Sequence, residues 1–230
     1  MNNYKLRWPF LILFLSLIHL AHAAPKVYVY QVGAYDYSNS QEIVLDIYDR
    51  NQCEGNLLCV NTNYKKALLK FSGLTVPAGK YKVELLLTCK QYISSGTLYL
   101  YQFKEFRWDD PGAAYNPPPE GTYATWNFRN YSSASWQAVG GEGSTEMGAL
   151  IAQFPISGAV NISASFNAEY AQEVTALGFA LKGDASIVFY EKDTAGTTQD
   201  KNPKLILTEN RSMLGGLDWN RFFRLFRLMR

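Results

Sequence analysis

The chain has 230 residues and a formal net charge of +2, with 22 Lys and Arg against 20 Asp and Glu. The two ends carry more positive charge than this excess, +2 before position 24 and +4 in residues 211–230, so residues 24–210 have a net charge of −4. A mildly acidic body does not have the basic face of a nucleic-acid-binding domain, and we expect no nucleic-acid partner. The only histidines are His19 and His22. Residues 24–230 therefore cannot support histidine-dependent catalysis or a histidine zinc site.

Residues 1–23 have the pattern of a secretory signal peptide. Lys5 and Arg7 precede a short apolar run over residues 8–20, and Ala-His-Ala at 21–23 is a small-x-small cleavage pattern. The apolar run is shorter than the roughly 20 residues that span a bilayer. The sequence therefore predicts cleavage after residue 23 and a protein that is secreted, either extracellular or at the cell surface.

Residues 24–210 are long enough for one domain and carry strand and turn signals at regular spacing. In residues 97–103, for example, Leu98 and Leu100 alternate with Tyr99 and Tyr101. The expected strands are residues 26–32, 42–48, 64–71, 81–89, 97–103, 149–156, 177–182, 186–191 and 204–208. Residues 161–174 are expected to form a strand followed by one or two helical turns. The pattern predicts an all-β sandwich or barrel.

A long segment at residues 109–148 interrupts the strand pattern. It contains four prolines, several glycines and an aromatic stretch over residues 123–136. A loop of this length inside a compact domain is usually functional or disordered. The segment is therefore the first place to look for a binding site.

Four blocks of residues 24–210 resemble the DNRLRE-type modules, which are also grouped as carbohydrate-binding module family 96. The first block is KALLKF at 66–71 with LTVPAG at 74–79, similar to the family's LLKF and PAG opening. The second is KVELLL at 82–87 with GTLYLY at 96–101, similar to the family's pair of strands. This resemblance implies a jelly-roll β-sandwich.

The two remaining blocks follow in the family's order. The third is ATWNFR at 124–129 with SW at 135–136 and GG at 140–141, where the family has ATWNYR, W and GG. The fourth runs from LGFALKG at 177–183 to NPKLILT at 202–208. Glu142 stands where the family often has Asp. The resemblance implies a module without catalytic activity that attaches to polysaccharide, with alginate-like acidic glycans among the ligands.

The side chains that would bind a sugar are an aromatic platform and a few charged or amide groups. Both kinds occur within residues 126–136, and Arg129 could form two parallel hydrogen bonds with a uronate carboxylate. The candidate carbohydrate-binding residues are Trp126, Arg129, Tyr131, Trp136, Tyr99 and Tyr101. The alternative for the aromatic residues is core packing, and the alternative for Arg129 is a structural ion pair.

Cysteine and aspartate residues provide two further predictions. Cys53 and Cys59 flank a short polar loop and are the candidate disulfide, while pairing of Cys89 with either of them stays open. Jelly rolls often bind a structural Ca²⁺ through loop oxygens, and this ion is the one cofactor that we consider. Its weak candidate ligands are Asp36, Asp46, Asp109 and Asp110, which lack the spacing of an EF-hand.

Residues 211–230 form a separate basic tail. In residues 217–230 the arginines fall on one half of a helical wheel and the aromatic residues on the other. Such a helix is typical of binding to a membrane surface or to a protein partner. We expect a short amphipathic helix outside the core.

The sequence therefore predicts a secreted, non-catalytic carbohydrate-binding domain. One alternative is a structural extracellular or cell-surface protein that makes protein–protein contacts. Another is a histidine-free polysaccharide lyase. Saturable binding to soluble polysaccharide distinguishes the first two, and release of unsaturated products would identify a lyase.

Overall fold

The structure is a computed structural model that describes most of the predicted domain. The described residues are 24–32, 39–47, 53–54, 58–61, 64–108, 114–115, 123–130, 132–170, 174–192 and 196–210. The predicted leader and the basic tail with its expected helix lie outside these ranges. Within them the chain is all-β, and its helical segments are the short 3₁₀ turns η1 (Val139–Gly141) and η2 (Gly196–Lys201). None of the described helices is long and apolar enough to cross a membrane.

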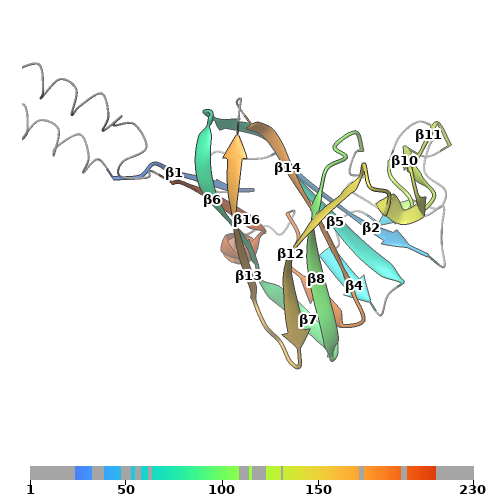
Figure 1. The fold of residues 1–230 in the computed structure, drawn as a ribbon. Helices are drawn as coiled ribbons and strands as arrows, with labels where there is room; N and C mark the ends of the chain where they lie inside the picture. The colour runs from blue at the N-terminus through green and yellow to red at the C-terminus, as the bar shows by residue number, and fades with distance from the viewer. Residues whose placement is uncertain are drawn as a thin grey trace, which may run out of the picture.

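Two antiparallel sheets face each other (Figure 1). The smaller sheet has the order β1 (Val27–Gln31), β16 (Lys204–Glu209), β6 (Gly79–Leu87), β13 (Ile162–Tyr170). The larger sheet has the order β12 (Met147–Ile156), β8 (Gly96–Phe103), β14 (Val174–Gly183), β5 (Lys65–Val76), β2 (Ser40–Asp46), β3 (Cys53–Glu54), β9 (Ala114–Tyr115). Beside that path, β15 (Ser186–Phe189) pairs with β4 (Leu58–Asn61) and β7 (Cys89–Ser94). A separate hairpin joins β10 (Phe128–Asn130) and β11 (Ala134–Ser135).

The pairing of the long strands defines a jelly roll. Counted along the chain, the eight principal strands are β1, β5, β6, β8, β12, β13, β14 and β16. The first pairs with the eighth and the second with the seventh. The third pairs with the sixth and the fourth with the fifth. An antiparallel ribbon nested in this way and wrapped into two sheets is the eight-stranded jelly roll, so the predicted fold class is confirmed.

Alternating side chains fill the core between the two sheets. In β6 every second residue from Tyr81 to Leu87 is buried, and in β8 Leu98 and Leu100 are fully buried. The predicted alternation is confirmed, because in a strand residues two apart share a face. Tyr99 therefore lies on the opposite, outer face of the larger sheet.

A second apolar cluster lies on that outer face. Residues 104–146 connect β8 to β12, and buried side chains of their described parts pack against the larger sheet. The buried members of the cluster are Leu45, Leu68, Phe103, Trp108, Ala124, Trp126, Trp136 and Ala180. We call residues 104–146 the insert. It covers one part of the outer face and leaves the part around Tyr99 only partly covered.

Two expectations about local structure change. Residues 162–170 are strand throughout, because all nine pair in continuous register with β6, so the helical turns expected in this segment are wrong.

The cysteine positions are also informative: Cys59 and Cys89 pair with neighbouring residues of β15 from its two sides. Their backbones are thus about two strand spacings, or about 10 Å, apart, and a disulfide needs less than about 7 Å. A Cys59–Cys89 bond is excluded, while the side chain of Cys53 lies outside the described residues and its bond to Cys59 stays a prediction.

Candidate functional site

A small cavity of about 190 Å³ lies on the outer face of the larger sheet, at the border of the insert. We call it the sheet pocket. It is lined by Lys65, Lys66, Tyr99, Tyr101, Trp126, Glu142, Lys182 and Gly183. Three of the six sequence-predicted binding residues, Tyr99, Tyr101 and Trp126, therefore meet in one place.

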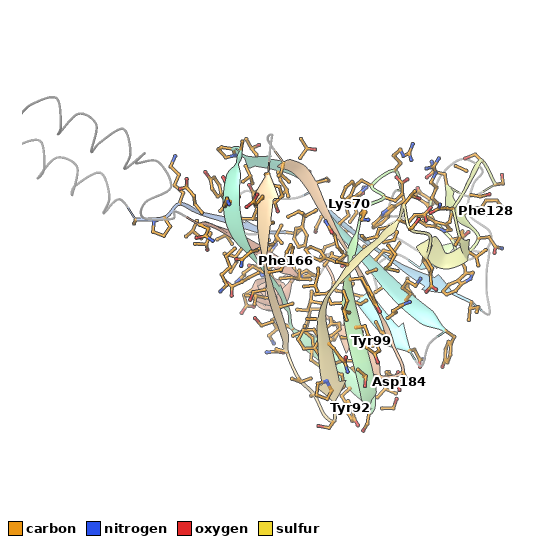
Figure 2. The ribbon with its side chains drawn as sticks, in the orientation of Figure 1. Lys70, Tyr92, Tyr99, Phe128, Phe166 and Asp184 are labelled. Carbon is orange, nitrogen blue, oxygen red and sulfur yellow. The ribbon has the colours of Figure 1, made fainter. Side chains whose placement is uncertain are left out.

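Strand register brings the aromatic and basic side chains together. Tyr99 of β8 pairs with Lys182 of β14, and Tyr101 pairs with Ala180. Directly paired residues of adjacent strands point to the same face. Figure 2 shows Tyr99 on β8, the strand next to the edge strand β12 of the larger sheet. Ala180 is small and is covered by the insert. The side chains of these paired residues that a ligand can contact are therefore those of the two tyrosines and Lys182.

One carboxylate joins two lysines in the sheet pocket. Glu142 Oε1 accepts hydrogen bonds from Lys66 Nζ at 2.8 Å and from Lys182 Nζ at 3.2 Å. Lys66 Nζ also donates to the carbonyl oxygen of Gly140 at 2.6 Å. The Lys66 ammonium lies 5.1 Å from the centre of the Trp126 ring, in a cation–π contact. Lys66 and the insert thus hold Glu142 in place at the edge of the pocket.

Burial sets the protonation of this group of charges. Burial lowers the pKa of Lys66 from 10.5 to about 8, although the hydrogen bond and charge of Glu142 act in the opposite direction. Burial alone would raise the pKa of Glu142, but hydrogen bonds and charge from Lys66 and Lys182 outweigh it and lower that pKa. With Lys65 included, three basic side chains and one acidic side chain line the pocket. Its charge favours an anionic ligand.

The other predicted residues have different positions. Trp136 is 5% exposed, donates from Nε1 to the carbonyl oxygen of Thr125 at 2.8 Å, and packs edge-on against Phe103. It belongs to the core, so its predicted role as a sugar platform is wrong, because the insert folds back onto the sheet and buries the ring. Tyr131 lies outside the described residues. Trp126 is 7% exposed and is one of the residues that line the sheet pocket.

Arg129 lies at a second cavity, which is lined by residues of the insert. This cavity has a volume of about 460 Å³, and we call it the loop pocket. Its lining residues are Lys104, Glu105, Phe106, Arg107, Arg129, Ser135, Gln137, Thr145 and Glu146. Arg129 Nη1 donates to Glu105 Oε2 at 2.9 Å, and Arg107 donates to both oxygens of the same carboxylate. Arg129 therefore makes the structural ion pair that was the alternative to uronate binding.

Glu105 is expected to make the protein sensitive to acid. Hydrogen bonds from Arg107, with a smaller contribution from Arg129, lower its pKa from 4.5 to about 2. The unfolded chain takes up this proton near pH 4.5, so stability is present above that pH and is lost as the pH falls towards 2. We expect a loss of about 1–3 kcal/mol that Glu105→Gln does not show. Urea unfolding of the native protein and of Glu105→Gln at pH 7 and pH 2.5 measures this loss. If the free energies of unfolding of the two proteins differed by the same amount at both pH values, the prediction would be contradicted.

The charged residues of the sheet pocket were missed by the sequence prediction. Lys66 and Lys182 were noted only as parts of family-like blocks, and Glu142 only as a departure from the family. The signal for Lys182 was limited to its place as the charged residue near the end of an apolar run, and its pairing with Tyr99 was not predicted. Lys66 carried no such signal, because its partner Glu142 is far away in the sequence and meets it only when the insert folds over β5.

The predicted calcium ligands are not described by the structure. Asp36, Asp109 and Asp110 lie outside the described residues, as does the side chain of Asp46. Among the described side chains, no three of the His, Cys, Asp and Glu type gather where they could hold a metal ion. Calcium binding stays a prediction.

No family model matches the chain, and no curated protein shows significant similarity to it. Among solved structures, a match is found with the C-terminal CBM6 of LamC, a marine laminarinase from Zobellia galactanivorans. The two chains are 10% identical, and the match covers 80% of this chain and 100% of the other with a TM-score of 0.27. A TM-score this low does not relate the two folds, so the jelly roll is established by the strand pairing described above.

Proposed function

We propose that this protein binds an acidic polysaccharide through the sheet pocket and does not cleave it. The observation that carries the proposal is the convergence of Tyr99 and Tyr101 with Lys65, Lys66 and Lys182 around one small hollow. Aromatic side chains with a few well-placed charged groups are the usual lining of a ligand site. The resemblance of four sequence blocks to the DNRLRE-type modules supports the same ligand class.

Each part of the pocket has a distinct task in this proposal. The half-buried rings of Tyr99 and Tyr101 offer an apolar surface to the C–H face of a sugar ring. Lys182, whose side chain is 33% exposed, forms a charge-assisted hydrogen bond with a uronate carboxylate. Glu142 accepts hydrogen bonds from sugar hydroxyls and keeps Lys182 in position above Tyr101, whose ring centre is 5.2 Å from the ammonium.

A polymer can continue along the sheet beyond the small pocket. On the neighbouring strand β12, Gln153 pairs with Tyr99 and Leu150 pairs with Tyr101. Leu150 is 49% exposed, so the row of side chains that begins at the pocket stays accessible across this strand. A linear glycan lying across β8 and β12 would contact the two tyrosines of β8 and the side chains that pair with them on β12.

The binding test compares two lysines of opposite sheets. We expect Lys182→Gln to weaken binding of the full chain to a soluble polyuronate about tenfold, because a hydrogen bond to a charged group is worth about 1.5–3 kcal/mol and Lys182 is partly exposed. Tyr99→Ala should weaken it to a similar extent by removing the ring. The measurement is isothermal titration calorimetry at low and at moderate salt, where charge-dependent binding falls as salt screens it.

Lys82→Gln is the matched control. Lys82 lies on β6 in the other sheet and its side chain is 50% exposed, so its loss should leave binding unchanged. An equal loss in the Lys82 and Lys182 variants would indicate nonspecific attraction by charge and contradict the proposal, as would no binding to any polyuronate. Appearance of unsaturated products, followed by ultraviolet absorbance, would replace the proposal with a lyase activity.

A further inference from the structure

Across the strands, the sheet pocket is open on one side and closed on the other. Tyr99 of β8 pairs with Gln153 of β12, and the side chain of Gln153 is exposed. On the opposite side lie Lys66 of β5 and its paired residue Leu45 of β2, which are 2% and 0% exposed. Both contact the insert, Lys66 through a hydrogen bond and Leu45 through the outer apolar cluster. A glycan that enters the pocket from β12 therefore cannot continue past β5.

Along the strands, the pocket is closed at one end and negatively charged at the other. Two residues beyond Tyr101 on the same face of β8, Phe103 is fully buried in the outer apolar cluster. In the opposite direction, beyond Tyr99, lies Asp184, which is exposed and accepts a hydrogen bond from the backbone N–H of Thr97 (Figure 2). This carboxylate repels a polyanion, so an acidic glycan leaves the pocket towards β12.

A pocket with this outline does not admit the middle of a linear polymer. In a 1,4-linked polyuronate the two linkages leave each sugar ring from opposite ring atoms, so an internal ring needs open space on two opposite sides. Here each direction of entry faces an obstacle, since β12 lies opposite β5 and the Asp184 end lies opposite Phe103. A ring at the end of a polymer has one linkage and needs one open side.

Glu142 and Lys182 indicate which end of the polymer fits. Lys182 Nζ and Glu142 Oε1 are 3.2 Å apart, so a donor and an acceptor lie side by side in the pocket. A uronic acid offers the complementary pair on adjacent ring carbons, the carboxylate on C5 and the hydroxyl on C4. In a 1,4-linked polymer the C4 hydroxyl is free only at the non-reducing end, because every other ring uses this oxygen in a linkage.

We infer that the sheet pocket binds the non-reducing end of a polyuronate, with Lys182 bonded to the terminal carboxylate and Glu142 to the terminal C4 hydroxyl. The following rings lie across β12, over the exposed side chains of Gln153 and Leu150. The inference rests on the proposed function, since it specifies which part of the polymer the same pocket binds. One polymer then occupies the pocket of one protein molecule, however long the polymer is.

Tetrasaccharides that differ only at the non-reducing end test this inference. Cleavage by a polysaccharide lyase leaves a terminal ring with a C4=C5 double bond and no C4 hydroxyl, whereas acid hydrolysis leaves a saturated ring that has the hydroxyl. We expect the full chain to bind the saturated tetrasaccharide about tenfold more tightly, because a site that bonds a hydroxyl discriminates against a ligand that lacks it. Isothermal titration calorimetry measures both affinities, and borohydride reduction of the other end of the saturated ligand should leave its affinity unchanged.

Two variants assign the contacts through the ratio of the two affinities. Glu142→Gln should reduce the preference for the saturated tetrasaccharide to about threefold, because a hydrogen bond to a neutral acceptor is about half as strong as one to a carboxylate. Lys182→Gln should weaken both ligands alike and keep the preference at about tenfold, since both ligands carry the terminal carboxylate.

The outcomes separate this inference from the proposed function. Equal affinities of the native protein for the two tetrasaccharides would overturn the inference and leave the proposed function intact. The same conclusion would follow if the number of protein molecules bound to one polyuronate rose with its length, or if borohydride reduction abolished binding. Failure of the native protein to bind either tetrasaccharide or longer polyuronates would overturn the proposed function and the inference with it.

Discussion

Replacing Trp136 with alanine is expected to lower the free energy of unfolding by about 3–5 kcal/mol, the usual cost of removing a buried Trp or Phe side chain. The indole is 5% exposed and lies in the cluster that joins the insert to the larger sheet. Its ring centre is 5.9 Å from that of Phe103 at a steep angle. Its loss would also leave the carbonyl oxygen of Thr125 without the Nε1 donor. Urea unfolding with linear extrapolation measures the change.

Two control variants make this result interpretable: one keeps an aromatic ring at position 136, and the other shortens an exposed side chain nearby. Trp136→Phe keeps a ring beside Phe103 and should cost less than the alanine variant. Val139→Ala lies in the same segment, but its side chain is 58% exposed, so we expect a change within about 0.5 kcal/mol. If Trp136→Ala unfolded like the native protein and lost glycan binding instead, the ring would be a ligand platform, as the sequence predicted.

The difference between the predicted and observed roles of Trp136 has a physical cause. Sequence alternation predicted correctly that Leu98 and Leu100 lie on one face of the strand and Tyr99 on the other, because strand geometry alone decides this. Alternation does not show whether the outer face is open or covered. Covering depends on the path of the insert, which is fixed by contacts between residues far apart in the chain, such as Trp126 with Lys66.

A sign of the covered face was nevertheless present in the sequence. In β14 the residues from Leu177 to Leu181 are all buried, and in β5 the residues from Lys66 to Phe71 are all buried. Strands that are apolar on both sides indicate a sheet with both faces packed, whereas strict alternation indicates one solvated face. Read in this way, the run LGFAL of β14 would have predicted a layer on the outer face, whereas the run KALLKF of β5 would not, because Lys66 and Lys70 lie on its outer face beside Leu68.

The nested strand pairing is the part of the fold that alternation could not supply. Residues that pair in the jelly roll are widely separated, as in the pairing of Val27 with Thr208. The resemblance to a known family predicted this topology, and local patterns did not. Local patterns also could not identify the partner of Arg129. Glu105 lies 24 residues away in the sequence and reaches Arg129 only through the fold of the insert.

The buried ammonium of Lys66 is expected to make stability depend on alkaline pH. Its pKa falls from 10.5 to about 8 on folding, mainly because its side chain is buried. Between these values the unfolded chain binds more protons, so the stability conferred at position 66 rises as the pH increases from 8 to about 10. Relative to Lys66→Met, we expect the native protein to gain about 2–3 kcal/mol over this range.

Comparison with Lys66→Met isolates the contribution of position 66, because groups far from it contribute equally to both proteins and cancel in the difference. Urea unfolding of both proteins at pH 7.5 and pH 10 gives the measurement. A difference that stays flat with pH would mean that Lys66 keeps an ordinary pKa. A charge this costly persists beside Trp126 because the same ammonium bonds Gly140 and Glu142, and so joins the insert to the sheet at the edge of the proposed binding pocket.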